Sequence, residues 1–309
     1  MKKRVIFIWF QYHQIVKKCQ PFAAALKSFL GYLEGTEKSA HTIKNYRLDV
    51  LAFHSFLERQ SGAVPVRMDQ LSVADLERYH DYLKATSQKT NTRRRKLLTA
   101  HRFLRYLSKR NQLAAEIPTK LPAPHKVERV PLTFSRAELV ERIATLPKDT
   151  ILDRRNRALL RLLAETGCLV SEIGQLRFRD LEGVELSIPG KAARKVAISE
   201  ELAHEVAELR SGGKSILGAD DFIFLGYNRH GPLKEAISPR GVELLVRFYA
   251  TKLECARLTP RNFRHSAVLA WFQEGIAQAE IQRRLGLKTP YAFRTFAPLL
   301  SEASAKPRN

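Results

Sequence analysis

A run of prolines in the middle of the chain limits its possible folds more than any other feature. Four of them stand in a basic stretch between residues 116 and 132: Pro118, Pro122, Pro124 and Pro131. Proline lacks an amide hydrogen and keeps the residue before it out of the helical region, so no helix continues through this stretch. We therefore expect an extended linker over residues 116–132, with a separate domain on each side of it.

The sequence before this linker has the periodicity of a helical domain. One set of apolar residues recurs every three or four positions, as on the buried face of a helix: Ile43, Tyr46, Val50, Phe53 and Leu57. Thr42 stands just ahead of this set and is expected to cap its helix. Three more helices are expected, at residues 22–33, 73–85 and 91–109.

These four helices predict an N-terminal helical domain over residues 21–115. Ser72 and Asp75 begin the second of the three further helices in the manner of a capping box. Residues 1–20 are expected to form an N-terminal extension. Their six-residue apolar run is too short for a membrane span, and no small-residue cleavage site follows it.

The sequence after the linker mixes helical and strand patterns. Ser135 and Glu138 form a capping box that restarts helical structure, and a leucine-rich helix is expected over residues 153–165. Two alternating apolar runs, at residues 184–188 and 196–198, flank a glycine-bearing loop and predict a β-hairpin. Later helices are expected at residues 242–253, 262–273 and 277–285.

The whole chain is therefore expected to be mainly α with a small β-sheet. The four-helix domain is followed by a mixed α/β domain over residues 133–300 and a short tail over residues 301–309. An apolar content of 44% is enough for two packed cores and argues against disorder.

Charge is the strongest signal in the composition. The chain has 53 Lys and Arg against 31 Asp and Glu, a net charge of +22. Such a surplus repels itself unless a polyanion is bound, so nucleic acid is the expected partner, with an ordinary basic protein as the alternative. The three cysteines have no metal-ligand spacing, which predicts a reduced protein without metal or cofactor. We expect a cytoplasmic, nucleoid-associated protein that has no membrane partner.

The densest positive charge lies on the helix expected at residues 91–109. Its first turns carry four consecutive cations, Arg93, Arg94, Arg95 and Lys96, and no acidic residue occurs between positions 89 and 110. A helix of this kind suits the DNA backbone, and its first turn has the form to enter a major groove. A solvated basic face is the alternative interpretation.

Four ordered segments of the second domain carry the most specific pattern. They are Thr-Gly-Cys-Leu-Val-Ser-Glu at residues 166–172, Gly-Lys at 190–191, Leu-Thr-Pro-Arg-Asn-Phe-Arg-His at 258–265, and Leu-Gly-Leu at 285–287 followed by Phe296. In order and spacing they resemble the signature boxes of the tyrosine recombinases, the phage integrase family, and of its Xer-like members in particular. The helices before the linker resemble the SAM-like core-binding domain of that family, so the resemblance covers about residues 22–300.

The resemblance implies a definite chemistry. In this family a tyrosine hydroxyl attacks one DNA phosphate and displaces the 5′ hydroxyl, which leaves a covalent phosphotyrosine bond. Two arginines stabilise the charge on the phosphate oxygens, a lysine protonates the leaving oxygen and a histidine assists. The reaction uses no metal or cofactor.

Only part of this catalytic set is present here. Lys191 matches the family's lysine and Arg264 matches its second arginine, while Arg261 stands where most members have a histidine and still offers a charge to phosphate. Three further positions have lost the family's residue: Leu169 for the first arginine, Leu287 for a late histidine or tryptophan, and Phe296 for the tyrosine.

We therefore expect a protein that clamps duplex DNA without transferring strands on its own, as an accessory subunit beside an active recombinase or as a regulator. The residues expected to contact DNA are Arg93, Arg94, Arg95, Lys96, Lys191, Arg240, Arg261 and Arg264. Two alternatives stay open: an active recombinase whose nucleophile is Tyr291 or another copy's tyrosine, and a protein-interaction module whose DNA binding is incidental. Leu299 and Leu300 are candidates for self-association on DNA, against a frayed tail.

Overall fold

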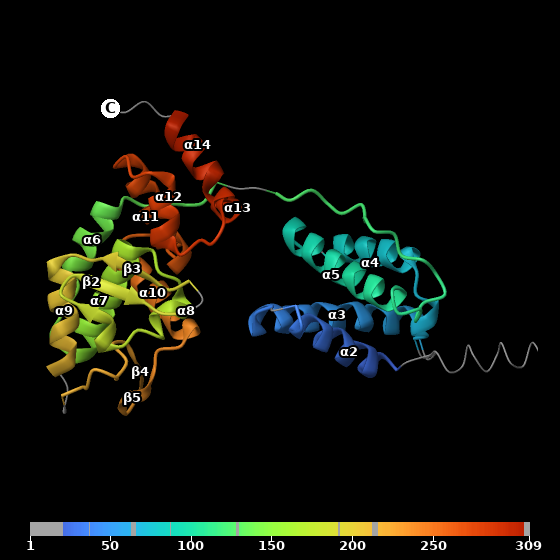
Figure 1. Ribbon diagram of the computed structural model, residues 1–309, viewed down its shortest axis with the longest axis horizontal. Coiled ribbons are helices and arrows are strands. Elements are labelled where there is room, and N and C mark those ends of the chain that lie inside the picture. Colours follow the sequence, from blue (N-terminus) through green and yellow to red (C-terminus); the bar gives the residue numbers. More distant parts are fainter. Residues whose placement is uncertain are drawn as a thin grey trace, which may run out of the picture. The chain divides into compact units, whose positions relative to one another are not determined.

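The computed structural model describes residues 21–305 apart from positions 37, 63–65, 87, 128–129, 191 and 212–215, and it leaves undescribed the side chains at 291–292 and 302–305. The chain divides into two compact units, residues 1–127 and 128–309 (Figure 1). The expected N-terminal extension, with Cys19, lies outside the described residues.

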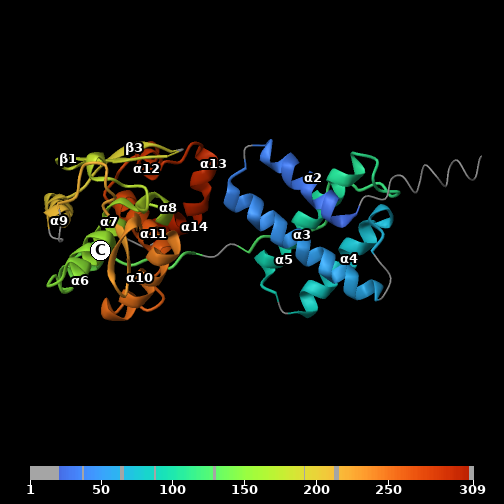
Figure 2. The ribbon, with the colours of Figure 1, turned by 90° about the horizontal axis from the view of Figure 1, so that it is seen from below.

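The first unit is built from four helices, as expected from the periodicity. They are α2 (Phe22–Glu34), α3 (Ala40–Ser61), α4 (Val73–Ala85) and α5 (Thr90–Ser108), with a short 3-10 turn, η1 (Met68–Gln70), before α4. Figure 2 shows these helices packed into one bundle. Their inner faces meet in an aromatic core in which no ring is more than 2% exposed: Phe29, Phe53, Phe56, Tyr79 and Phe103.

Side-chain caps set two of the helix starts in this unit. α4 begins at the expected capping box, in which the Ser72 amide donates to Oδ2 of Asp75 at 2.8 Å. α3 begins earlier than expected, because Ser39 is its cap: the Ser39 hydroxyl accepts from the Thr42 amide at 3.2 Å. The prediction that Thr42 caps this helix is wrong, and Thr42 lies inside the first turn.

Residues 116–127, the larger part of the expected linker, are bonded along α5 and are called the strap below. Ile117 is 6% exposed and packs into the core of the first unit. The strap runs antiparallel to α5, and four α5 side chains bond its backbone: Asn91 with Val127, Arg94 with Pro124, His101 with Pro118 and Arg105 with Thr119. Proline explains the extended conformation, and the polar face of α5 holds it in place.

The second unit is a mixed α/β unit. Its helices are α6 (Arg136–Ala144), α7 (Ile151–Thr166), α8 (Val170–Ile173), α9 (Glu200–Ser211), α10 (Pro239–Lys252), α11 (Pro260–Gln273), α12 (Gln278–Leu285), α13 (Pro290–Phe293) and α14 (Ala297–Ala305), with 3-10 turns η2 (Phe178–Asp180) and η3 (Arg294–Phe296). Ser135 caps α6 by accepting from the Glu138 amide at 3.3 Å, which is one half of the expected capping box. The expected helices at α7, α10, α11 and α12 are confirmed.

Two small antiparallel sheets complete the second unit. The expected hairpin is present as β2 (Glu185–Ile188) and β3 (Arg194–Ala197), and β1 (Leu181–Glu182) adds to the edge of β2. A second hairpin, β4 (Leu225–Asn228) and β5 (Gly231–Ala236), was not expected. Its apolar residues do not alternate over enough positions to predict a strand, and a bulge interrupts its register.

The core of the second unit forms around α7, which packs against α6, α9 and α11. Four leucines close together in α7 are at most 1% exposed: Leu159, Leu160, Leu162 and Leu163. A smaller apolar cluster lies between α11, α12 and η3 and contains Trp271 and Phe296. The last helix, α14, packs back on α11 of the same chain and buries Leu299. None of the helices in the described residues is long and apolar enough to cross a membrane.

Candidate functional site

The segment at residues 166–172, called the Thr-Gly box, begins at the last residue of α7 and turns at a glycine. Gly167 ends α7 in the left-handed region, with a φ of 59°, and its amide bonds to the Leu163 carbonyl. A Cβ at this position would lie 3.3 Å from the Cα of Arg264. Glycine is therefore required both for the turn and for the close approach of α11.

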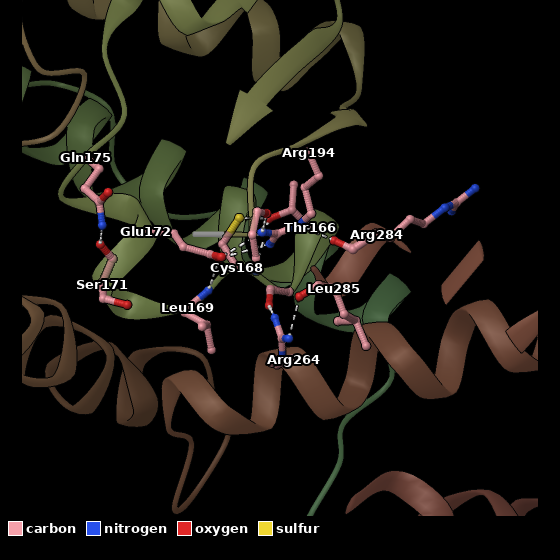
Figure 3. Close-up of polar contacts among 12 residues, drawn as sticks. Thr166, Cys168, Leu169, Ser171, Glu172, Gln175, Arg194, Arg264, Arg284 and Leu285 are labelled. Carbon is pink, nitrogen blue, oxygen red and sulfur yellow. Dashed lines mark hydrogen bonds and ion pairs between the residues drawn. The ribbon is translucent and has the colours of Figure 1, made fainter. Parts of the chain in front are cut away.

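Arg264, which the family resemblance matches to the second arginine, is held by the backbone around it. Its Nη1 donates to the Gly167 carbonyl at 2.7 Å, and its Nη2 donates to the Leu285 carbonyl at 2.8 Å (Figure 3). Its side chain is 8% exposed, and burial lowers its pKa from the usual value. Arg264 therefore ties α11 to the Thr-Gly box and to the end of α12.

A buried ion pair supports the same region from the other side. Both terminal nitrogens of Arg194 bond the Glu172 carboxylate, at 2.7 and 3.0 Å, and the pair is almost fully buried (Figure 3). The carboxylate also accepts from the Leu169 amide at 2.8 Å, and Arg194 Nε donates to the Arg284 carbonyl at 2.6 Å. Three sequence-distant segments, the Thr-Gly box, β3 and α12, therefore meet at one charged contact.

The segment at residues 285–287, called the Leu-Gly box, packs closely on the β2–β3 hairpin, which explains its glycine. Gly286 ends α12 with a φ of 67°. A Cβ there would lie 2.8 Å from Nη1 of Arg194 and 2.9 Å from Cβ of Ala192. The turn thus brings the end of α12 against the hairpin that carries Lys191. Lys191 itself lies outside the described residues, as does the side chain of Tyr291.

The three positions expected from the sequence to be degenerate line one pocket of about 500 Å³. Leu169, Leu287 and Phe296 line it together with Arg261 and Arg264, so the structure brings together five of the residues singled out in the sequence. Leu169 is 45% exposed and Leu287 is half-buried, and neither fills the space. Phe296 is only 4% exposed and belongs to the apolar cluster beneath the pocket.

His265 is a pocket residue that the sequence reasoning passed over. Burial, followed by the charges of Arg261 and Arg264, lowers its pKa to about 4, so the imidazole is neutral at pH 7. Its ring meets Phe296 edge to face at 5.5 Å, and its Nδ1 has no hydrogen-bond partner among the described residues. The sequence could have indicated this residue, because His265 directly follows Arg264 and lies one helical turn after Arg261.

The basic cluster of α5 is largely bonded within the first unit. Arg94 donates to the strap at Pro124, and Arg95 is paired with the buried carboxylate of Asp49. Arg93 donates to the Thr90 hydroxyl at 3.2 Å. The side chain of Lys96, by contrast, makes no hydrogen bond or ion pair in the described part of the chain.

Outside the pocket, Arg240 is exposed at the start of α10 and pairs with Glu243 at 3.0 Å. Arg261, which lines the pocket at the start of α11, is exposed, and its side chain makes no hydrogen bond or ion pair with any other described residue. In the described ranges, no group of histidine, cysteine, aspartate or glutamate side chains could hold a metal ion.

Comparison with known proteins assigns both units. The model of the phage integrase N-terminal SAM-like domain matches residues 26–111, and the model of the phage integrase family matches residues 134–293. Among curated proteins, tyrosine recombinase XerC of Staphylococcus haemolyticus (strain JCSC1435) is 25% identical over 253 residues, which cover 80% of this chain and 82% of that protein. XerC of Staphylococcus aureus (strain JH9) is 26% identical over 254 residues, with the same coverage.

Solved structures share the fold at low sequence identity. XerH bound to its difH substrate in a pre-cleavage complex matches with a TM-score of 0.65 and 18% identity, over 95% of this chain and 88% of that chain. A lambda integrase dimer bound to a core site matches with a TM-score of 0.62 and 14% identity, over 94% of this chain and 98% of that chain. The two family models together cover most of the sequence, and the chain belongs to the phage integrase family of tyrosine recombinases.

Proposed function

We propose that this protein binds duplex DNA but does not transfer DNA strands by itself. One observation carries the proposal: Leu169, Leu287 and Phe296 line one pocket, and all three side chains are apolar. The family resemblance matches these positions to the first arginine, the late histidine and the tyrosine. Strand transfer needs a nucleophilic oxygen and donors for the phosphate oxygens. Leu169, Leu287 and Phe296 supply neither.

The remaining cations support DNA binding rather than catalysis. Arg261 is exposed at the pocket and free of carboxylate partners among the described residues, and Arg240 is exposed one helix earlier. The chain as a whole carries a net charge of +22, which suits a polyanion. XerH and lambda integrase, which share the fold, are bound to DNA in the structures compared above.

Most of the α5 cations could contact DNA only by giving up the partners that they have in this structure. Arg94 and Arg105 donate to strap carbonyls, so phosphate oxygens would have to replace those acceptors. Arg95 would have to leave Asp49. Lys96 needs no such exchange and is the cation of this cluster that we assign most directly to DNA, together with Lys191 of the hairpin loop.

We assign this protein a role as an accessory subunit beside an active recombinase or as a site-specific regulator. Either role needs a DNA clamp made of the helical domain, which includes the strap, and the mixed domain that follows it. Neither role needs a nucleophile, because the cutting group would come from another protein or no cut would be made.

A nicked duplex provides the direct test. Bound duplexes are first selected from a random pool, and the selected site is then rebuilt with a nick that traps any covalent protein–DNA intermediate. S. aureus XerC on a nicked duplex carrying its own site is the positive control. We expect binding that weakens steeply with salt and no adduct on a denaturing gel. Phe296→Tyr alone should also give none, because Leu169 and Leu287 still offer no donors.

A covalent adduct formed by the wild-type chain would overturn the proposal. If Tyr291→Phe then removed that adduct, Tyr291 would be the nucleophile of a rearranged site. Binding that does not respond to salt, or that is absent at low salt, would instead favour a protein-interaction module.

A further inference from the structure

The pocket at the degenerate positions has the size and lining of a small-molecule site. Its volume of about 500 Å³ lies within the usual range of ligand pockets, which combine apolar walls with a few convergent polar groups. Its apolar walls come from the Thr-Gly box, from the approach to α11 and from the C-terminal segment: Leu169, Val170, Leu258, Leu287 and Phe296. A DNA phosphate gains nothing from such walls.

The polar groups of the pocket favour an anion. Arg261 and Arg247 both line it, are exposed and have no carboxylate partner among the described residues. Glu243 is the acidic residue of the lining, and its carboxylate is paired with Arg240 outside the pocket at 3.0 Å. The pocket therefore offers unbalanced positive charge beside apolar surface.

His265 lines the pocket with its ring almost fully buried. His265 is 5% exposed, and its Nδ1 is fully buried without a hydrogen bond to the described residues. An atom buried to this degree is closed to a ligand in the pocket, so His265 contributes its ring to the wall and not this nitrogen. The ring is neutral at pH 7, because its pKa is lowered to about 4, and the positive charge comes from Arg261, one helical turn away, and from Arg247.

We propose that this pocket binds an organic anion that carries an aromatic ring, of the arylalkyl carboxylate class. The ring lies against Phe296 and the two leucines, and the carboxylate meets Arg261 and Arg247. The site goes beyond the DNA-binding role and does not depend on it, because no DNA-contacting step is needed for the ligand to bind.

The test uses the full-length protein without DNA and three probes measured by ligand-observed NMR. They are 4-phenylbutyrate, its neutral analogue 4-phenyl-1-butanol, and butyrate, which lacks the ring. We expect 4-phenylbutyrate to bind with a dissociation constant on the order of 1 mM or below, given its small size. Each of the other two should bind at least about tenfold more weakly. Equal binding of the acid and the alcohol, or no binding of either, would overturn the proposal.

A matched pair of variants locates the site. Leu169→Asp places a negative charge on the exposed pocket rim, and we expect it to weaken 4-phenylbutyrate binding at least about tenfold. Val184→Asp is the control, because Val184 is 42% exposed, similar to Leu169, and does not line the pocket. Circular dichroism confirms that both variants fold. Equal effects of the two substitutions, or no effect of Leu169→Asp, would place any binding elsewhere and refute the inference.

Discussion

Replacing Arg194 with methionine tests whether the buried ion pair holds the pocket region together. Both ends of the pair are hidden from solvent, with exposed side-chain fractions of 3% for Arg194 and 10% for Glu172. Methionine fills similar space but leaves the carboxylate with the Leu169 amide as its remaining bonded partner. Removing one partner of a buried pair costs about 3–5 kcal/mol, since a charge is left without compensation.

The double variant Glu172→Gln/Arg194→Met should cost much less than the single Arg194→Met. A glutamine oxygen still accepts from the Leu169 amide, and no charge is left buried. The difference between the single and double variants isolates the pairing, and we expect a coupling of about 2 kcal/mol or more. Lys195→Met is the control on the same strand, because it breaks the exposed pair with Glu185 and should change the unfolding free energy far less.

Tryptophan fluorescence during urea unfolding measures these free energies. In a Trp9→Phe background, Trp271 is the single tryptophan; it is 4% exposed, and the guanidinium of Arg284 lies 5.4 Å from its ring centre. It therefore reports on the second unit alone. If Arg194→Met cost less than about 1 kcal/mol, or if the double variant were as unstable as the single one, the pair would not have the role assigned to it.

Three further predictions follow from single residues. Gly286→Ala should lower the free energy of unfolding of the second unit by more than about 1 kcal/mol in urea, because backbone strain and a steric clash add together. Gly275 is also left-handed but has open space around it, so Gly275→Ala should cost only the backbone strain. The pKa of His265 in the folded state, about 4, lies below its ordinary value of 6.5. The stability that its neutral ring contributes is fully present above pH 6.5. As the pH falls toward 4, the free energy of unfolding should decrease by up to about 3 kcal/mol, because the unfolded chain takes up the proton first. Urea titrations from pH 7 to 4 should show that slope in the wild type and not in His265→Asn. Asn91→Ala removes two hydrogen bonds to Val127, each worth about 1 kcal/mol, and should speed hydrogen exchange at the Val127 amide; unchanged exchange would mean that the strap is held otherwise.

The sequence was enough for the main elements because their signals are local. The four N-terminal helices and α7, α10, α11 and α12 each follow from apolar spacing within one segment, and α3, α4, α7, α10 and α11 also begin at a side-chain cap. The β4–β5 hairpin escaped because its strands are short and bulged, so no alternation marks them. A cap one turn early at Ser39 escaped because Thr42 has the same capping chemistry.

The sequence was enough to predict which residues line the site, but not the hydrogen bonds and ion pairs that hold the site together. The motif order led to Leu169, Arg261, Arg264, Leu287 and Phe296, which the fold does bring to one pocket. No local pattern could pair Arg194 with Glu172, 22 positions earlier, or bind the strap to α5. Such contacts depend on which surfaces meet after folding, and the periodicity of one element carries no information about its partner.

The contacts of Arg264 change what its presence says about function. It holds two backbone carbonyls, at Gly167 and Leu285, so the fold needs it whether or not a phosphate ever arrives. The side chains of Leu169 and Phe296, at positions expected to be degenerate, hold no backbone carbonyl: Leu169 is exposed at the rim, and Phe296 packs in the apolar cluster. Survival of Arg264 is therefore weak support for DNA binding. Arg261, exposed and unbonded to other described residues, is explained by no folding contact in the structure, and a bound anion is the better reason for a cation there.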